Sequence, residues 1–357
     1  MVTHGNRDFP ENRLRSGSRL SCRWARRVSF DVVNTTEVLG LPRLVHELER
    51  LEPLLATSVT TGDPFLDQVT THLIAAGGKR LRPLLTLASG TAGDRPATQE
   101  ELLGGVAVEL VHLASLYHDD VIDEATVRRN VQSVNGRFGN LVAIVAGDYL
   151  LARSAAIAAE LGTEIAGLLA RTLGQLCQGQ VTEVHSAFQP NRTREEYFST
   201  IAGKTAALMA TSCRIGGLTG GLPRPEIEAL TTFGQCFGMV FQLRDDVLDV
   251  VAGEQELGKP AGQDLAEGIY TLPVLAALED KATGRELRTL LGQPLAQPER
   301  DKARQIVAAS SGIAVTLEAG RRYVDQAKGA LEAVASPQLR DGLGRLTEAL
   351  LQGIPGF

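Results

Sequence analysis

The chain has 357 residues, 43% of them hydrophobic and 22% charged, which is enough to bury one large core or two modest ones. Its formal net charge of −6 gives no reason to expect a nucleic-acid partner. Charged residues interrupt the most apolar stretches, so we expect no transmembrane segment, although peripheral membrane contact remains open. The four cysteines show no CxxC pair or zinc spacing, which predicts buried or incidental thiols in a reducing, cytoplasmic compartment: Cys22, Cys177, Cys213 and Cys236.

Residues 1–31 differ in composition from the rest of the chain. Seven arginines stand against two acidic residues in the first thirty positions, with no apolar periodicity and no uninterrupted apolar core of the kind that a secretory signal needs. We interpret this segment as a basic, disordered tail, or as sequence upstream of the true start, followed by an all-helical domain over residues 32–357. Contact of the tail with anionic lipid is the alternative.

From residue 32 onward the pattern is helical almost throughout. Ala, Leu, Glu and Arg recur at helical spacing, whereas the strict alternation typical of strands is absent. Turns are expected at the Gly- and Pro-containing positions 77–78, 219–223, 257–260 and 293–294. The pattern predicts an all-α, single-domain bundle of ten or more helices. The clearest helical segments are residues 98–116, 141–161, 164–184, 194–215, 224–240 and 318–335.

Two basic motifs stand where a phosphate-binding protein needs them. The first is the run GGKRLRP at residues 77–83, in which Lys79 and Arg82 share a face if a helix begins there. The second is the pair Arg128 and Arg129, whose guanidinium groups can each bind a diphosphate through two hydrogen bonds. Each motif alone is weak evidence, because an arginine pair is usually part of a solvated surface. Their occurrence beside two acidic clusters raises the weight of both.

Two aspartate clusters with the same DDxxD spelling are the most informative feature of the sequence. On a helix the first and last aspartates of each cluster lie one turn apart on the same face. Carboxylates that are packed together repel one another and need cations between them, and Mg²⁺ takes oxygen ligands from carboxylates and substrate phosphates. A single cluster is equally well explained as a solvated helix N-terminus. The pair predicts a magnesium-dependent diphosphate site formed by Asp119, Asp120, Asp123, Asp245, Asp246 and Asp249.

The order of the motifs resembles the trans-isoprenyl (polyprenyl) diphosphate synthase family. The resemblance covers nearly all of residues 71–273 and implies an isoprenoid synthase fold around a central cavity. In that family Mg²⁺ binds an allylic diphosphate, which ionises, and isopentenyl diphosphate attacks the carbocation. The matching motifs are GGKRLRP (77–83), HLASLYHDDVID (112–123), RR (128–129), GDYLL (147–151), QGQ (178–180), KT (204–205), FQLRDDVLD (241–249), GKP (258–260) and DLAEGIYTLP (264–273).

The resemblance implies a role for the polar residues of these motifs. The expected Mg²⁺ ligands are Asp119, Asp123 and Asp245, with further support from Asp120, Asp246 and Asp249. The residues expected to bind the allylic diphosphate are Arg128, Lys204 and Lys259. The residues expected to bind isopentenyl diphosphate are Lys79, Arg82, His112 and Arg129. The residues expected beside the developing positive charge are Thr205 and Gln242.

His112 and Ile269 are interpreted from the positions that they occupy in the family motifs. A lone histidine on an apolar helix is more often a core residue, but His112 lies two turns before Asp119 on the same face, where the family has a phosphate-binding residue. Ile269 stands where the family often has a lysine. A phosphate contact is therefore absent or replaced, and we expect weaker allylic binding or a preference for longer allylic chains.

The residues just before the first aspartate cluster predict the length of the product. In short-chain relatives of the family, aromatic rings four or five positions before the cluster close the pocket, whereas this chain has small residues there. The resemblance therefore implies a product of about six to ten isoprene units, or about C30 to C50. Replacing Ala114 with Phe is then expected to shorten the product to about C15 to C20. The residues expected to control length are Val111, Ala114 and Ser115.

Other interpretations stay open at this level. The product is alternatively geranylgeranyl diphosphate or another short chain. The family expectation is a homodimer, but the chain is alternatively the catalytic subunit of a heteromeric heptaprenyl-type synthase. A class I terpene cyclase is less consistent, because the GGKR run and the arginine pair serve a second diphosphate that a cyclase does not bind. Intact aspartates in both clusters argue against a non-catalytic partner subunit.

Overall fold

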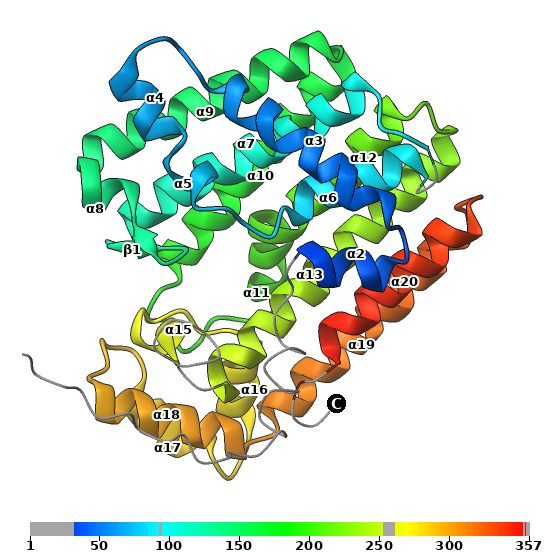
Figure 1. Cartoon of the computed structure of the whole chain (residues 1–357). Helices are drawn as coiled ribbons and strands as arrows, with labels where there is room; N and C mark the ends of the chain where they lie inside the picture. The colour runs from blue at the N-terminus through cyan, green and yellow to red at the C-terminus, as the bar shows by residue number, and fades with distance from the viewer. Residues whose placement is uncertain (1–31, 93–94, 253–260, 353, 355–357) are drawn as a thin grey trace, which may run out of the picture.

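The structure is a computed structural model that describes residues 32–92, 95–252, 261–352 and 354. The predicted tail over residues 1–31 lies outside the described residues, as does Lys259. The described chain is helical almost throughout, which confirms the predicted all-α class (Figure 1). The helices are α2 (Val32–Leu39), α3 (Arg43–Ser58), α4 (Pro64–Thr70), α5 (His72–Ala75), α6 (Leu81–Thr91), α7 (Gln99–Ile122), α8 (Val134–Phe138), α9 (Asn140–Glu160), α10 (Thr163–His185), α11 (Arg194–Ile201), the π-helical turn η1 (Ala202–Ala206), α12 (Ala207–Thr219), α13 (Arg224–Val251), α15 (Gln263–Ala266), α16 (Leu272–Glu279), α17 (Gly284–Leu290), α18 (Gln297–Ala309), α19 (Gly312–Leu331) and α20 (Pro337–Leu351).

Helix α7 lies among the other long helices of the bundle. It packs against α3, α6, α9 and α12, and α12 in turn packs against α13. One apolar core fills this bundle, and a second one lies among α13, α16, α17, α18 and α19. Helix α13 runs from the bundle into the second group of helices and so joins the two cores (Figure 1). Burial of these apolar side chains is the main driving force for the fold.

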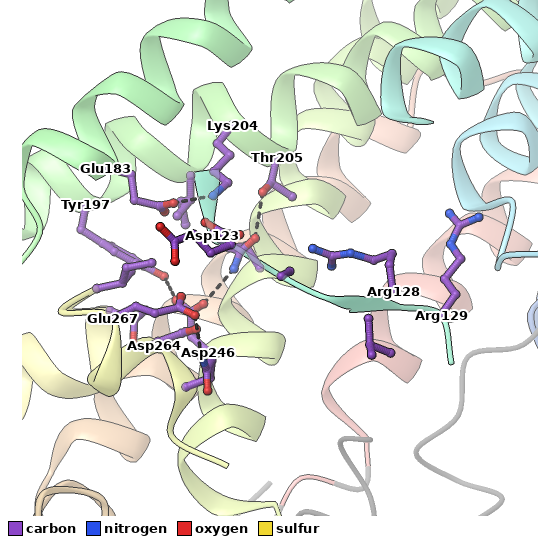
Figure 2. A pocket seen from close by; sticks show the side chains of 18 of the residues that line it. Asp123, Arg128, Arg129, Glu183, Tyr197, Lys204, Thr205, Asp246, Asp264 and Glu267 are labelled. Atoms are coloured by element: carbon purple, nitrogen blue, oxygen red, sulfur yellow. Dashed lines mark hydrogen bonds and ion pairs between the residues drawn. The ribbon is translucent and has the colours of Figure 1, made fainter. Parts of the chain in front are cut away.

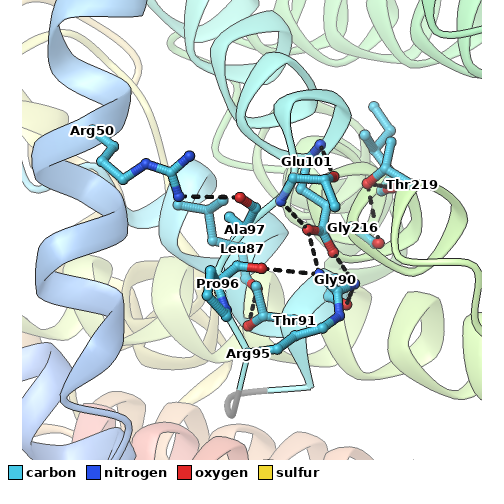
Figure 3. Close-up of polar contacts among 12 residues, drawn as sticks. Arg50, Leu87, Gly90, Thr91, Arg95, Pro96, Ala97, Glu101, Gly216 and Thr219 are labelled. Carbon is cyan, nitrogen blue, oxygen red and sulfur yellow. Dashed lines mark hydrogen bonds and ion pairs between the residues drawn. The ribbon is translucent and has the colours of Figure 1, made fainter.

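A buried carboxylate fixes the N-terminal end of α7. Glu101 is fully buried, and it accepts hydrogen bonds from the Thr98 amide at 2.7 Å and from Arg95 Nη2 at 2.6 Å (Figure 3). The Thr98 hydroxyl accepts from the Glu101 amide in return, which completes a capping box. Gly90 permits this arrangement, because a Cβ there would lie 2.7 Å from Glu101 Oε1. With one end anchored, α7 holds the aspartates at its other end in a defined position.

Both aspartate clusters are part of helices, whereas the helical segments predicted from the sequence end before them. The predicted segments 98–116 and 224–240 stop before the clusters, but α7 continues to Ile122 and α13 to Val251. Each cluster therefore occupies the last turns of a long helix, where the helix dipole disfavours negative charge. The alternative of a solvated helix N-terminus is wrong for both clusters, and the need for a neutralising cation becomes greater.

Two local features differ from the predicted pattern. The predicted helix over residues 194–215 is divided into α11 and α12 by η1, and π-helical turns of this kind often mark functional sites. A two-residue antiparallel ladder joins β1 (Val127–Arg128) to β2 (Val131–Gln132), although the sequence pattern indicates no strand. The ladder is a short loop feature that follows α7 and carries the predicted arginine pair.

One described helix, α9, is long and apolar enough to cross a membrane by length and composition alone, although Asp148 and Arg153 lie within it. In this fold α9 packs along α7 and also contacts α8 and α10. Ser154 donates to the carbonyl oxygen of Ala107 at 2.8 Å, and Gly147 lies so close to His118 that a Cβ would be 2.3 Å from Nε2. One side of α9 is therefore part of the bundle, and its other side is exposed.

Candidate active site

A cavity of about 860 Å³ lies where the C-terminal ends of α7 and α13 approach the turn η1. Figure 2 shows carboxylates from both helices beside the same space, with Lys204 and the arginine pair around it. A cavity wall of mixed charge suits a charged ligand that carries its own counter-ions. The charged side chains on the described part of this wall are Asp123, Glu124, Glu183, Asp246, Asp264, Glu267, Arg128, Arg129, Arg192 and Lys204.

The first aspartate cluster divides into outward-facing and inward-facing residues. Asp123 caps α7 and lines the cavity, and Asp119 lies one turn earlier on the wall of a neighbouring pocket. Burial raises the pKa of Asp119 to about 6, although the charge of Lys204 opposes the shift. Asp120 is fully buried, accepts a hydrogen bond from Arg128 Nε at 2.7 Å and forms an ion pair with Arg128 Nη2 at 2.5 Å. Asp120 therefore positions Arg128 on the cavity wall.

The second cluster occupies the last turns of α13. Asp246 is buried on the cavity wall, and this burial raises its pKa to about 7. Asp245 is about half-exposed, forms an ion pair with Arg244 at 3.1 Å and is not part of that wall. Asp249 is buried and accepts a hydrogen bond from the backbone of Asp264 at 3.4 Å, which joins α13 to α15. Of the three aspartates, Asp246 faces the cavity.

A chain of hydrogen bonds joins the second cluster to η1. Thr205 Oγ1 donates to Gln242 Oε1 at 2.8 Å, and Gln242 Nε2 donates to Asp246 Oδ1 at 2.8 Å. The Tyr197 hydroxyl donates to the other oxygen of Asp246. Because both oxygens of Asp246 have partners, the carboxylate is held in one orientation. The structure thus brings together Thr205, Gln242 and Asp246, three of the candidate site residues.

Lys204 reaches the cavity from η1 and forms an ion pair with Glu183 of α10. Burial disfavours the charge of Lys204, but the ion pair outweighs this effect and raises its pKa. Two glycines allow the helices to approach: a Cβ on Gly179 would lie 2.6 Å from the Lys204 backbone nitrogen, and one on Gly203 would lie 2.9 Å from the Gln175 carbonyl oxygen. The QGQ and KT motifs are therefore the two sides of one close helix contact.

Two of the residues predicted to bind a second diphosphate, Arg82 and His112, line the neighbouring pocket together. Burial lowers the pKa of Arg82 to about 10. Burial also lowers the pKa of His112 well below its usual value, and the charge of Arg82 adds to the shift, so the imidazole is neutral. A neutral histidine between arginines can donate one hydrogen bond to an anion without adding to the charge repulsion.

The glycines of the GGKR run accommodate Arg129. The Arg129 guanidinium donates to the carbonyl oxygen of Gly77, whose φ of +79° favours glycine. A Cβ on Gly78 would lie 2.8 Å from Arg129 Nη1, so this position must also lack a side chain. Lys79 follows these glycines. Burial lowers the pKa of Lys79, and the negative charge of Asp245 only partly opposes this shift. The run therefore holds Arg129 in place on the cavity wall, whereas Lys79 lines neither the cavity nor the neighbouring pocket and lies within the electrostatic reach of Asp245.

A second, mostly apolar pocket of about 320 Å³ adjoins the cavity and shares Lys204 and Thr205 with it. Val111 and Ser115 of the predicted chain-length set line this pocket. Ala114 is fully buried and is not part of its wall, so the effect of Ala114 on product length stays a prediction. The other apolar residues of the wall are Leu116, Ile122, Leu151, Leu173, Leu176 and Val181.

Several residues on the cavity wall are absent from the predicted set. Asp264 and Glu267 belong to the matching DLAEGIYTLP motif, so motif membership was a signal that could have identified them. Glu183 follows the QGQ motif by three residues and has a weaker signal of the same kind. Arg192 and Tyr197 lie in no matching motif, and only the folded chain places them at the cavity.

The carboxylates fit a hard divalent cation. Carboxylates outnumber cationic side chains on the cavity wall. Nearby, Asp120 Oδ2 is a buried oxygen with no hydrogen-bond partner among the described residues. In the described ranges, no three His, Cys, Asp or Glu side chains form a closed metal cage. Mg²⁺ is usually held by one or two carboxylates, waters and substrate phosphates, so an open arrangement suits it. The cluster residues therefore fit a metal whose remaining ligands come from a diphosphate.

An all-α bundle in which two aspartate clusters border a charged cavity and an apolar pocket defines an enzyme of the prenyltransferase class. The chain belongs to the polyprenyl synthetase family, whose model matches residues 63–309.

Comparison with individual proteins agrees with this family. Over 301 residues the chain is 36% identical to a nonaprenyl diphosphate synthase of Mycobacterium tuberculosis, covering 84% of this chain and 90% of that protein. It is also 36% identical over 304 residues to heptaprenyl diphosphate synthase component 2 of Geobacillus stearothermophilus, covering 83% and 92%. The crystal structure of a Caulobacter crescentus polyprenyl synthase complexed with calcium and isoprenyl diphosphate superposes with a TM-score of 0.81 at 30% identity, covering 87% of this chain and 97% of that one.

Proposed function

We propose that this chain is a trans-polyprenyl diphosphate synthase that condenses isopentenyl diphosphate onto farnesyl or geranylgeranyl diphosphate and gives a product of about C30 to C50. The main evidence for this proposal is that the charged cavity and the apolar pocket adjoin, since Lys204 and Thr205 line both. A substrate with its diphosphate in the charged cavity has room for its hydrocarbon chain in the apolar pocket. Relatives named nonaprenyl and heptaprenyl diphosphate synthases support a long product.

In the proposed reaction the allylic C–O bond breaks and its electron pair leaves with the diphosphate. Mg²⁺ held by Asp119 and Asp123 on one side and by Asp245 and Asp246 on the other would supply Lewis-acid stabilisation of that diphosphate. Lys204 stays protonated and stabilises the same developing charge. The Thr205 and Gln242 oxygens face the carbocation, and the double bond of isopentenyl diphosphate attacks it. The released diphosphate then accepts the proton whose loss restores an alkene.

The test of this proposal separates condensation from other reactions of allylic diphosphates. Purified chain and Mg²⁺ are incubated with labelled isopentenyl diphosphate, with and without farnesyl diphosphate. We expect a labelled prenyl product only when both substrates are present. A hydrocarbon product from farnesyl diphosphate alone would identify a cyclase and overturn the proposal.

The apparent affinity for Mg²⁺ is expected to weaken as the pH falls. Burial raises the pKa of Asp119 to about 6 and that of Asp246 to about 7, so both carboxylates are ionised at high pH and gain protons as the pH falls through 7 and 6. A metal must displace these protons, so we expect the Mg²⁺ concentration for half-maximal activity to rise about tenfold between pH 8 and pH 6. Metal titrations at the two pH values measure it, and equal half-saturation points would contradict the expectation.

We propose that the chain forms a homodimer through the exposed faces of α9 and α10. Of the eight exposed large hydrophobic side chains in the described ranges, five lie on these two helices, which pack against each other. An apolar surface of this kind on two adjacent helices is typical of a protein interface. The five residues are Leu141, Ile144, Val145, Val181 and Val184.

Charge placed on this face is expected to separate the subunits. Leu141→Glu and Val184→Glu should each shift the protein from dimer to monomer in light scattering coupled to size-exclusion chromatography. Ala308→Glu on the exposed part of α18 is the matched control and should leave the mass unchanged. A wild-type protein that is already monomeric at micromolar concentration would refute the homodimer.

A heteromer is the second candidate, because one relative of this chain is named a component of a heptaprenyl diphosphate synthase. In that case the purified chain is folded and binds Mg²⁺ but makes no product until a second protein is added. Product formation by the purified chain alone would exclude this alternative.

A further inference from the structure

A buried arginine on the cavity wall has no part in the site as predicted. Arg192 lies in the loop between α10 and α11, is only 7% exposed and lines the cavity. The capping box of α11 begins at the next residue, where the Thr193 hydroxyl accepts from the Glu196 amide at 3.1 Å and the Thr193 amide donates to Glu196 Oε2 at 2.8 Å. The capping box holds the backbone beside Arg192 in place, so the buried side chain has a defined position.

The guanidinium of Arg192 is incompletely satisfied. Its Nη2 donates to Thr200 Oγ1 at 2.5 Å, and its Cζ lies 5.8 Å from the ring centroid of Tyr197. Its Nε is buried without a hydrogen-bond partner, and Arg192 forms no ion pair with a carboxylate in the part of the chain that the structure describes. A buried cation with an unfilled donor is unfavourable unless an anion approaches it. Because Arg192 borders the cavity, a ligand can supply that anion.

The loop that carries Arg192 is docked on the loop that carries Ile269. The Phe188 amide donates to the carbonyl oxygen of Gly268 at 2.8 Å. Gly268 has a φ of +74°, and a Cβ there would lie 2.5 Å from the Phe188 ring, so this contact requires glycine. Ile269 lines the same cavity with an apolar side chain at the position where the family resemblance implies a lysine. The two docked loops therefore form one wall, on which Arg192 is cationic and Ile269 is apolar.

The carboxylates near Arg192 are already engaged by other groups. Glu183 forms its ion pair with Lys204, and Asp246 accepts hydrogen bonds from Tyr197 and Gln242. Their charges act on Arg192 from a distance and favour its protonated form, while burial acts more strongly in the opposite direction and lowers its pKa. The guanidinium, which is always charged in proteins, is thus held as a cation beside the cavity with no carboxylate paired to it among the described residues.

We propose that Arg192 binds an oxygen of the allylic diphosphate and replaces the cation that Ile269 does not supply. This inference rests on the proposed function. An arginine presents several N–H donors in one plane that match phosphate oxygens, and the Arg192 side chain borders the cavity. Arg192 determines how this chain holds its allylic substrate, while the isopentenyl site around Arg82 and His112 is separate from it.

The test replaces Arg192 with Met, which keeps the length of the side chain and removes the charge. We expect KM for farnesyl diphosphate to rise about ten- to a hundredfold, because a charged hydrogen bond is lost, while KM for isopentenyl diphosphate changes less than about twofold. Arg194→Met is the matched control, since Arg194 pairs with Glu279 outside the cavity wall. An unchanged KM for farnesyl diphosphate in Arg192→Met overturns the inference.

A double variant tests whether a lysine at position 269 can replace the positive charge that Arg192→Met removes. In the double variant Arg192→Met with Ile269→Lys, a lysine stands on the same wall, and we expect most of the affinity for farnesyl diphosphate to return. A purely structural role for Arg192, through Thr200 and Tyr197, predicts a lower Tm in Arg192→Met and no rescue by Ile269→Lys. That pair of results contradicts the inference.

A binding measurement distinguishes failure of this inference from failure of the proposed function. Inorganic pyrophosphate with Mg²⁺ is expected to raise the Tm of the wild-type chain and of Arg194→Met, and to raise that of Arg192→Met clearly less. If the wild-type chain condenses no prenyl substrates, the proposed function fails whatever Arg192 does. If it condenses them and pyrophosphate stabilises Arg192→Met as much as wild type, the inference alone fails.

Discussion

Asp123→Asn is expected to lower kcat by about a hundred- to a thousandfold, which is the largest catalytic effect that the site predicts. Asp123 lines the cavity at the C-terminal cap of α7 and is exposed, so the substitution removes a negative charge without leaving a buried group unpaired. Asn has nearly the same size and is tolerated at helix ends. The loss therefore reports on metal binding and not on folding.

The control for Asp123→Asn is the same substitution far from the cavity. Asp341 is exposed on α20, and Asp341→Asn is expected to leave kcat and Tm unchanged. Excess Mg²⁺ should restore part of the activity of Asp123→Asn, because a weakened metal site can be filled by mass action. If Asp123→Asn keeps full activity at low Mg²⁺ concentration, the first cluster does not hold the metal.

Ser115→Phe is expected to shorten the product to about C15 to C20, the largest effect on specificity. Ser115 lines the apolar pocket next to Val111, one turn before Asp119, so an aromatic ring there occupies the space into which a chain grows away from the metals. The Ser115 hydroxyl donates to the carbonyl oxygen of His112 within α7, and its loss leaves no unpaired buried donor. Chromatography of dephosphorylated products measures the change in length.

Ala114→Phe is the comparison variant, because Ala114 is adjacent in sequence but is fully buried outside the pocket wall. A ring at Ala114 overpacks the core and is expected to lower the stability by about 1–3 kcal/mol. Its effect on length depends on how far α7 shifts. Unchanged product length in Ser115→Phe would show that the pocket does not hold the growing chain.

The aspartate clusters and the basic motifs were predictable because their chemistry needs specific residue types at short, regular spacing. Six carboxylates in two DDxxD groups demand cations wherever the chain places them, and helical periodicity puts the first and last aspartates of each group on one face. The all-α class followed from the same periodicity. These features depend on local sequence and helical spacing, so one sequence is enough to predict them.

The remaining parts of the site depend on contacts between distant segments. The position of Asp246 on the cavity wall, with Asp245 outside it, depends on how α13 is rotated against α11 and η1. Arg192 reaches the cavity because its loop docks on Gly268, and no periodic pattern encodes that contact. The helix ends were underestimated because aspartates are poor helix formers, and packing of α7 and α13 overrides this preference.

The most direct measurement of the central claim is the length of the product made by the purified chain. The chain is incubated with Mg²⁺, labelled isopentenyl diphosphate and, separately, geranyl, farnesyl and geranylgeranyl diphosphates, and the dephosphorylated products are resolved by length. We expect a ladder that ends between about C30 and C50 from farnesyl or geranylgeranyl diphosphate. Products that stop at about C20 from every primer would contradict the long-chain assignment.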